Sequence, residues 1–165
     1  MVIPLFKVFM SEEAVQASAD VLRSGYVGQG PKVDEFEEHL SQFLSTDFVV
    51  TTNSATSAES LAYHILKTPA NYRIFTPFDS ASEYQTLEWP GLAKGDQVLA
   101  SPLTCTATNW PIISNGLDIR WVDTCPATLG PDLDDLKRKI SPKTKIISIV
   151  PVSYTHLTLP TILLV

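Results

Sequence analysis

The residues from Thr51 to Ala58 have the types and spacing of a phosphate-binding helix start. The apolar, β-branched run Phe48–Thr51 predicts a short buried strand, and small and hydroxylated residues follow it. The first N–H groups of a helix have no partners inside it and lie at the positive end of its dipole. We therefore expect a strand that leads into a helix whose first turn binds a phosphate group. Apolar residues at helical spacing support that helix: Ala55, Ala58, Leu61, Ala62, Ile65 and Leu66.

An ordinary capped helix, without any ligand, would show the same residues. Asn53 or Ser54 is the expected cap, and Ser, Thr and Asn are favoured at that position whether or not a phosphate is bound. The segment by itself leaves both interpretations open.

Composition narrows the class of protein. The 165 residues are 44% hydrophobic, which suffices for one domain with a substantial core. The formal net charge is −6 and no Lys/Arg cluster is present, which argues against a nucleic-acid or anionic-membrane surface. No apolar run approaches the ~20 residues of a membrane span. Because Met1–Leu5 also lacks the regions of a signal peptide, we expect a cytoplasmic protein. Cysteines and histidines show no metal-ligand spacing, so no metal site is predicted.

Two helices are expected before the phosphate segment. Ser11 would cap a helix that ends before Gly25, and Pro31 would open another at its favoured first position. The loop between them, residues 25–30, has the pattern Gly-x-x-Gly-x-Gly. It is not a dinucleotide fingerprint, because that motif must follow a strand. We interpret it as a close backbone turn that presents the aromatic face of Tyr26.

The second half of the chain has the pattern of an α/β fold. From Gly95 onward, short apolar strands alternate with helices, which predicts a parallel sheet covered on both faces. Ligands of such sheets bind beyond the C-terminal ends of the strands, where Thr52–Thr56 and Ser101–Thr106 should lie. We expect strands at 97–100, 119–122 and 145–150, and helices at 107–114 and 133–140.

Residues 67–94 interrupt this alternation. Their length exceeds the ~12–15 residues beyond which structureless loops are uncommon, so we expect either an insertion with its own structure or a functional flap. Trp110 and Trp121 are expected to be core residues. The cluster of Asp132, Asp134 and Asp135 is typical of a helix start.

Four segments, in their order and spacing, resemble the DegT/DnrJ/StrS class of pyridoxal-phosphate-dependent sugar-nucleotide aminotransferases. The resemblance implies a fold-type-I transferase with a three-layer αβα architecture and a mainly parallel sheet. Residues 1–151 would be the N-terminal part of its large domain, with 67–94 as the insertion or flap. The segments are Ile3–Leu5, Ser24–Glu37, Thr52–Ala58 and Gly95–Asn109.

The same resemblance implies a cofactor site for pyridoxal 5′-phosphate (PLP). Ser54, Ala55 and Thr56 would hold the cofactor phosphate through backbone N–H groups and the Thr56 hydroxyl. Cys105 falls where the class places a residue against the face of the pyridine ring, and a polarisable sulfur could fill that role. Cys105 could equally be a buried core thiol, since free cysteines are commonly buried.

For the substrates, the class implies transfer of an amino group from glutamate or glutamine to a keto sugar nucleotide, within a homodimer when full length. Tyr26 and Gln29 match the loop that lines the substrate side of the pocket. The Schiff-base lysine of the class lies beyond Val150, so no catalytic residue is nominated and the chain is expected to be inactive by itself. The lysines at 137, 139, 143 and 145 are interpreted as solvated surface.

Two other functions stay open from the sequence. One is a non-catalytic α/β module that binds a phosphorylated ligand at Ser54–Thr56. The other is a dehydratase-like or regulatory member of the family in which the lysine is replaced. Residues 152–165 match the conceptual translation of a sequencing adapter, so we expect a non-native tail. A natural terminal strand, rich in Thr and Leu, is the alternative.

Overall fold

The computed structural model describes residues 8–75 and 84–149. The chain forms two compact units, residues 1–51 and residues 52–165, and each is described here by itself. The predicted tail at 152–165 lies outside the described residues. Within the ranges that are described, no helix is long and apolar enough to cross a membrane.

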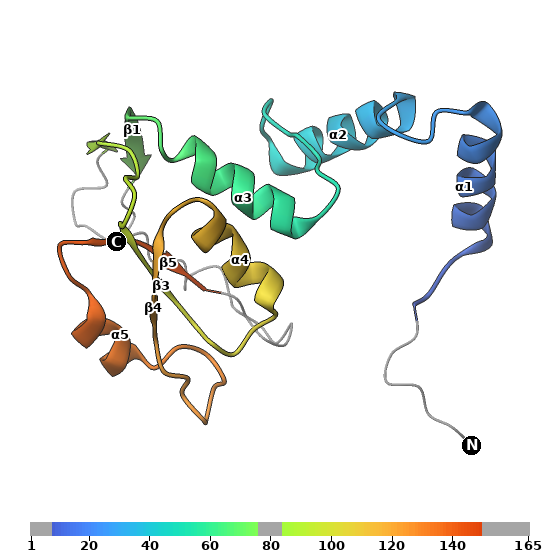
Figure 1. Ribbon diagram of the computed structural model, residues 1–165. Helices are drawn as coiled ribbons and strands as arrows, with labels where there is room; N and C mark the ends of the chain where they lie inside the picture. The colour runs from blue at the N-terminus through green and yellow to red at the C-terminus, as the bar shows by residue number, and fades with distance from the viewer. Residues whose placement is uncertain (1–7, 76–83, 150–165) are drawn as a thin grey trace, which may run out of the picture. The chain divides into compact units, whose positions relative to one another are not determined.

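Unit 1 contains the two helices that the sequence predicts, α1 (Glu12–Ser24) and α2 (Pro31–Leu44) (Figure 1). The Ser11 hydroxyl accepts the Ala14 N–H at 3.2 Å, which caps α1 at its start. Gly25 ends this helix with φ of 80°, a left-handed conformation that glycine adopts without steric cost. Pro31 occupies the first turn of α2 as expected.

The apolar residues of these helices are exposed or only half-buried. Neither helix has a buried residue, and Phe43 is 84% exposed. The apolar residues of α2 therefore do not form a core within this unit.

The predicted strand at Phe48–Thr51 is absent from the structure. These residues have no strand conformation, and Phe48 is 93% exposed. An extended segment needs a neighbouring strand to pair its backbone groups, and none of the described strands pairs with it. Instead, one Glu37 carboxylate oxygen accepts both the Thr51 N–H at 2.7 Å and the Thr51 hydroxyl at 2.8 Å. These two bonds lower the pKa of Glu37 and attach the segment to α2.

Unit 2 is built on a three-stranded parallel sheet in the order β4-β3-β5 (Figure 1). Its strands are β3 (Gln97–Ala100), β4 (Asp118–Trp121) and β5 (Thr144–Ser148), connected through α4 (Thr106–Ser114) and α5 (Leu133–Lys139). The chain passes from the central strand to one edge and then back to the other edge. Because such crossovers are right-handed, α4 and α5 must cover opposite faces of the sheet. All five elements were predicted from the sequence: the bounds of β3 agree, and those of the other four differ by one or two residues.

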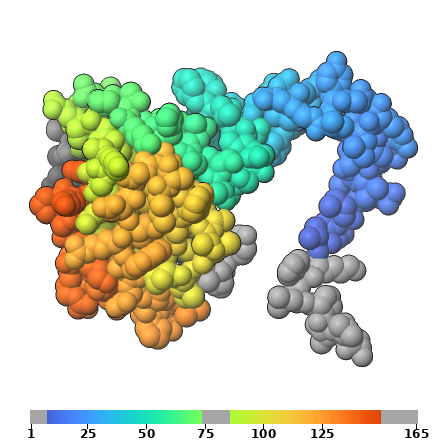
Figure 2. All heavy atoms as spheres, in the orientation of Figure 1, coloured from blue at the N-terminus to red at the C-terminus, as the bar shows by residue number. Residues whose placement is uncertain are grey.

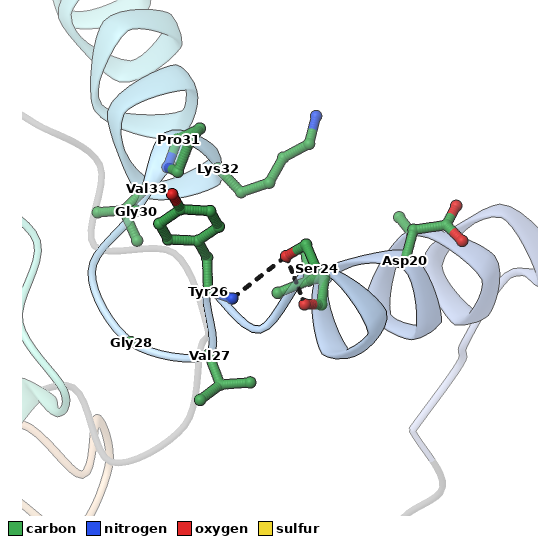
Figure 3. Close-up of a pocket in the computed structure, with 11 residues that line it drawn as sticks. Asp20, Ser24, Tyr26, Val27, Gly28, Gly30, Pro31, Lys32 and Val33 are labelled. Atoms are coloured by element: carbon green, nitrogen blue, oxygen red, sulfur yellow. Dashed lines mark hydrogen bonds between the residues drawn. The ribbon is translucent and has the colours of Figure 1, made fainter.

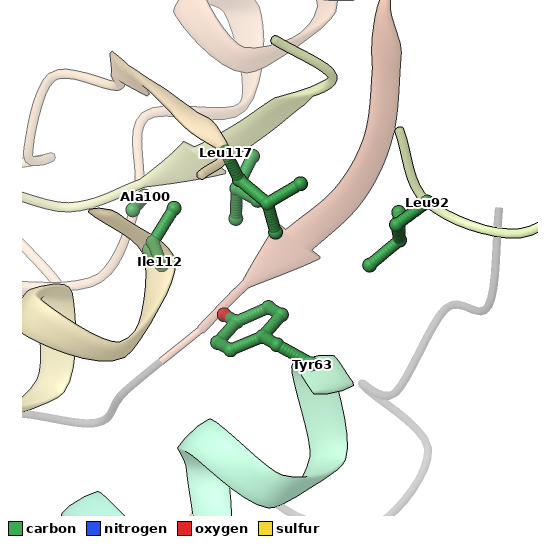
Figure 4. Close-up of a cluster of buried hydrophobic side chains, with 6 residues drawn as sticks. Tyr63, Leu92, Ala100, Ile112 and Leu117 are labelled. Carbon is green, nitrogen blue, oxygen red and sulfur yellow. The ribbon is translucent and has the colours of Figure 1, made fainter. Parts of the chain in front are cut away.

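The burial of the central strand confirms that both faces are covered. Val98 and Ala100 point to one face, where they pack with Tyr63, Ile112 and Leu117 (Figure 4). Leu99 points to the opposite face and is also fully buried. Figure 2 shows residues 84–149 packed closely against one another.

Both tryptophans that were expected in the core lie on the surface, so this prediction is wrong. Trp110 is 61% exposed and Trp121 is 46% exposed. On α4 the buried positions belong to Asn109, Pro111 and Ile112, so the intervening Trp110 faces outward. Trp121 ends an edge strand of the described sheet, where fewer neighbours cover a side chain.

The long stretch from 67 to 94 has secondary structure of its own. It forms an antiparallel pair of strands, β1 (Ala70–Phe75) and β2 (Tyr84–Trp89), and residues 76–83 lie outside the described part. Two hydrogen bonds to a single backbone oxygen connect this part of the chain with the end of the preceding helix. The Leu66 oxygen accepts the Trp89 indole N–H at 2.7 Å and the Leu92 N–H at 2.9 Å.

Candidate functional site

The proposed phosphate cradle is the start of helix α3 (Ala55–Ile65) in unit 2. Ser54, rather than Asn53, is the cap: its hydroxyl oxygen accepts the Ser57 N–H at 3.1 Å. Asn53 supports the turn by accepting the Ser57 hydroxyl at 2.7 Å. The Ser54 hydroxyl is therefore occupied in capping the helix. The backbone N–H of Ser54 is the group of this residue that could donate to a phosphate.

The first turn of α3 has the donors that a phosphate needs. Within the described residues, no hydrogen bond is formed to the N–H groups of Ala55 and Thr56, and both lie at the positive end of the helix dipole. Thr56 is half-buried and also carries a hydroxyl group. Donors of this kind, at the start of a helix, suit the phosphate group of PLP.

A buried carboxyl group lies on the next turn of α3. Glu59 follows Thr56 by three residues, about 4.5 Å along the helix axis. Its Oε2 atom is buried without a hydrogen-bond partner among the described residues, and burial raises the pKa of Glu59. Burial thus disfavours the charged form of this side chain.

We expect the Ser54→Ala variant to lose about 1 kcal/mol of the free energy of unfolding, the usual effect of removing such a cap. The measurement is urea unfolding followed by tryptophan fluorescence, since tryptophans at 89, 110 and 121 all lie in unit 2. Asn53→Ala is the matched control, because Asn53 accepts a side-chain hydroxyl and not a helix N–H. Equal losses in the two variants would show that the cap is not the stabilising contact.

Cys105 is the last residue of the loop that connects β3 with α4, and it occupies the N-cap position of α4. Its side chain is exposed, so the alternative of a buried core thiol is wrong. Helices α3 and α4 pack against each other in unit 2, and in Figure 1 both run from right to left. The Asn115 amide at the end of α4 fixes this packing by donating to the backbone oxygen of Ser60 at 3.2 Å.

The ends of β3 and β4 are joined by a side-chain contact. Ser101 and Thr124, which follow these two strands, have their hydroxyl oxygens 3.4 Å apart. The predicted rim at the C-terminal ends of the strands is therefore formed by polar residues from neighbouring loops, and Cys105 belongs to one of these loops.

Tyr26 and Gln29, the two predicted substrate residues, lie in unit 1 and so in a different unit from the phosphate cradle. Tyr26 lines a cavity of about 470 Å³ between the end of α1 and the start of α2 (Figure 3). Gln29 is exposed and does not line this cavity. The structure thus supports only Tyr26 as part of a concave site.

The position of Tyr26 depends on Gly30. The φ of Gly30 is −171°, an extended conformation open to any residue, so backbone freedom does not explain the glycine. A Cβ atom there would lie 3.2 Å from the Cβ atom of Tyr26 and 3.5 Å from Cδ1 of its ring. Gly30 therefore leaves room for the tyrosine to lie against the loop backbone.

From the sequence, Asp135 was placed only in an acidic cluster at a helix start. Its structural role was not predicted. Asp132 caps α5 by accepting the Asp135 N–H at 2.8 Å, while the Asp135 carboxylate is buried and accepts the Asp123 N–H at 2.8 Å. It also pairs with Arg138 at 2.9 Å and Lys139 at 2.7 Å. Lys139 is thus an ion-pair partner with a side chain only 27% exposed, which corrects its interpretation as solvated surface. The spacing of three and four residues was the available signal.

Comparison with known proteins decides the family. The model of the DegT/DnrJ/EryC1/StrS aminotransferase family matches residues 9–156. The chain belongs to this family. The family resemblance predicted from the four sequence segments is confirmed, and so is the α/β fold with a parallel sheet.

Individual relatives agree with this membership. The chain is 29% identical over 152 residues to the spore coat polysaccharide biosynthesis protein SpsC of Bacillus subtilis, covering 92% of this chain and 32% of SpsC. It matches the crystal structure of the sugar aminotransferase CalS13 from Micromonospora echinospora with 40% identity and a TM-score of 0.66, covering 90% of this chain and 34% of that one. The chain therefore spans about a third of the length of the relatives it matches.

The cofactor expected from the sequence is confirmed at the level of the family. Spr1654 of Streptococcus pneumoniae, solved in its PLP form, matches with 30% identity and a TM-score of 0.65 over 88% of this chain and 31% of that one. PLP is thus bound by a structure of the same fold and family.

Proposed function

We propose that this chain supplies the phosphate cradle and a substrate loop of an enzyme that transfers an amino group from glutamate or glutamine to a keto sugar nucleotide. The observation that supports it is the start of α3 in a family of PLP-dependent aminotransferases: the N–H groups of Ala55 and Thr56 and the Thr56 hydroxyl form no hydrogen bond within the part of the chain that the structure describes. PLP, when bound, supplies the electron sink for amino transfer. Cytoplasmic location and a full-length homodimer are parts of the same proposal.

Each nominated residue has a defined task in this proposal. The backbone N–H groups of Ser54, Ala55 and Thr56 bind the cofactor phosphate, and the Thr56 hydroxyl adds a fourth donor. Cys105 contributes an exposed sulfur at the start of the neighbouring helix, where it contacts the pyridine ring. Tyr26 and Gln29 contact the sugar nucleotide. Because this stretch is about a third of its relatives, it is expected to bind cofactor but not to turn over by itself.

The proposal is tested by the binding of pyridoxamine 5′-phosphate, which lacks the aldehyde that reacts with surface lysines. We expect Thr56→Val to weaken its binding about 10- to 100-fold, the effect of losing one hydrogen bond to a charged group. The measurement is isothermal titration calorimetry on the full chain. Thr56→Ser keeps the hydroxyl and should bind like the wild type.

Pyridoxamine without phosphate separates the phosphate contact from the ring contact. Its weak binding should be the same in the wild type and in Thr56→Val, because the hydroxyl faces only the phosphate. If wild-type chain binds both compounds equally, α3 is an ordinary capped helix and the proposal is overturned.

A second reaction, dehydration of a sugar nucleotide, is suggested by one of the relatives. A sugar-nucleotide dehydratase is also among the relatives, with 26% identity over 144 residues. Both chemistries use the same cofactor cradle, so the binding test applies equally to either. The sugar aminotransferase CalS13 matches with 40% identity, against 26% for this dehydratase, and amino transfer is therefore the function we propose.

A further inference from the structure

The chain reaches the proposed phosphate cradle through a segment that has little support of its own. Residues 48–51 form no strand and pair with none of the described strands. Phe48 is 93% exposed and Val50 is 75% exposed, so side-chain packing contributes little to the position of this segment. Its conformation therefore depends on hydrogen bonds.

Helix α2 supplies hydrogen bonds at both ends of this segment. At its beginning, the Thr46 N–H donates to the backbone oxygen of Ser41 at 3.1 Å, and the Ser41 hydroxyl donates to the Thr46 oxygen. At its end, one Glu37 carboxylate oxygen accepts the Thr51 N–H at 2.7 Å and the Thr51 hydroxyl at 2.8 Å. Because Glu37 precedes Ser41 by one helical turn, the segment runs back along one face of α2.

The Glu37 carboxylate is a strong acceptor for both Thr51 donors. Hydrogen bonds to a charged group are roughly twice as strong as neutral ones. The two bonds lower the pKa of Glu37, the Thr51 N–H more than the hydroxyl, so this side chain is charged at pH 7. Glu37 thus satisfies a backbone N–H that a neighbouring strand would otherwise have to satisfy.

The residues that follow Thr51 lead directly into the cradle. The Thr52 hydroxyl donates to the Ser54 backbone oxygen at 2.8 Å, and Asn53 accepts the Ser57 hydroxyl at 2.7 Å. These contacts join residues only two to four positions apart, so they shape the turn locally. Among the hydrogen bonds of the described residues 46–57, the two from Glu37 span the longest stretch of chain, 14 residues.

We infer, on the basis of the proposed function, that Glu37 is a positioning residue for cofactor binding. By holding Thr51, it fixes the backbone that presents the first N–H groups of α3 to the phosphate. Glu37 acts through Thr51 and is assigned no contact with the cofactor. Without Glu37 the segment adopts the binding conformation only part of the time, and the apparent affinity falls by that fraction.

The test measures the binding of pyridoxamine 5′-phosphate to the full chain by isothermal titration calorimetry. We expect Glu37→Ala to weaken binding about 10-fold, which corresponds to a binding-competent fraction of about one tenth. Glu37→Gln keeps an oxygen that can accept both Thr51 donors. Because neutral hydrogen bonds are roughly half as strong, this variant should weaken binding only about threefold. Glu38→Ala is the matched control, since it removes the same charge from an exposed neighbouring position of α2 and should bind like the wild type.

A double-mutant cycle tests whether Glu37 acts through Thr51. Thr51→Val removes the hydroxyl donor and keeps the N–H, so by itself it should weaken binding less than Glu37→Ala does. In the Glu37→Ala background the same change should have no further effect, because the acceptor is already gone. Losses that simply add would overturn the inference.

Two further measurements separate positioning from a general loss of stability. The tryptophans at 89, 110 and 121 all lie in unit 2, so its urea midpoint, followed by fluorescence, should be the same in Glu37→Ala and the wild type. Backbone ¹⁵N order parameters of residues 53–57, measured without cofactor, should fall in Glu37→Ala from about 0.85 to below about 0.6 and recover in Glu37→Gln. A lower midpoint in Glu37→Ala, or order parameters that do not change, would contradict the positioning role.

Because the order parameters are measured without cofactor, Glu37 and the proposed function can fail separately. If pyridoxamine 5′-phosphate binds in the Thr56-dependent way and Glu37→Ala binds it like the wild type, the positioning inference is wrong and the proposed function stands. If the cofactor does not bind but Glu37→Ala lowers the order parameters and Glu37→Gln restores them, the proposed function is wrong and the role of Glu37 in positioning the helix start is supported.

Discussion

The Gly91→Ala variant is expected to lose more stability than any other alanine substitution of a glycine in unit 2. Gly91 has φ of 85°, and a Cβ atom there would lie 2.4 Å from the backbone oxygen of Lys67. Real Cβ atoms do not approach an oxygen so closely, and a backbone carbonyl cannot rotate away as a flexible side chain can. The loop must therefore shift.

The loop at Gly91 is coupled to the core, which makes the shift costly. Leu92, the next residue, is a buried member of the hydrophobic cluster, and its N–H donates to the Leu66 oxygen. Trp89 donates to the same oxygen. Moving the backbone at residue 91 therefore disturbs two hydrogen bonds to the Leu66 oxygen. They connect β2 and the residues that follow it with the end of α3.

Gly116→Ala is the matched control. Its φ is 79°, but the nearest atom to a Cβ there is Cγ of Lys94, at 3.8 Å. The control should lose about 1–2 kcal/mol of unfolding free energy, the cost of a left-handed alanine. We expect Gly91→Ala to lose a further ~1–3 kcal/mol, as overpacking typically does. Urea unfolding measures both, and equal losses would contradict the steric explanation.

Asp135→Asn is expected to lower the urea midpoint of unit 2 at pH 7. The carboxylate accepts the Asp123 N–H and pairs with Lys139 and Arg138. An asparagine has a single oxygen, so its amide N–H groups would face donors. Asp134→Asn is the control, because Asp134 lies exposed in the same turn of α5. It should change the midpoint several times less.

The effect of Asp135 should depend on pH in a defined direction. The Asp123 N–H, followed by Lys139, holds the pKa of Asp135 far below its usual range. A carboxyl with a lowered folded-state pKa stabilises fully above its unfolded-state pKa, about 3.9, and this stabilisation is lost as the pH falls further. The difference between wild type and Asp135→Asn should thus be largest near pH 7 and decrease below about pH 4. A difference that grows on acidification would contradict this role.

The helices were predictable because their signals are local. The Ser11 cap, the glycine at position 25 and the proline at position 31 each act within one or two turns, and the structure has α1 and α2 at those residues. The β-α alternation after Gly95 likewise predicted the parallel sheet, since short apolar strands separated by helices have few other arrangements. The capped start of α3 was predictable for the same local reason.

Burial was less predictable, because it depends on which neighbours a side chain meets. Phe48–Thr51 has the composition of a buried strand, yet it finds no partner strand among the described residues and stays exposed. Trp110 is apolar, but the adjacent positions of α4 occupy the inner face. Asp135, an acid in a charged helix, is buried because the Asp123 N–H and two cations surround it.

The sequence by itself determined the family, the cofactor and the residues at the start of α3, because these depend on short motifs whose order along the chain is specific. Only the tertiary structure decided that Tyr26 lines a cavity while Gln29 does not, that Cys105 is exposed, and that Asp135 holds α5 to the end of β4. Motifs fix backbone conformation over a few residues. Exposure is set by which side chains and backbone groups meet in the folded chain, as when the Asp123 N–H meets the Asp135 carboxylate, and short motifs do not encode this.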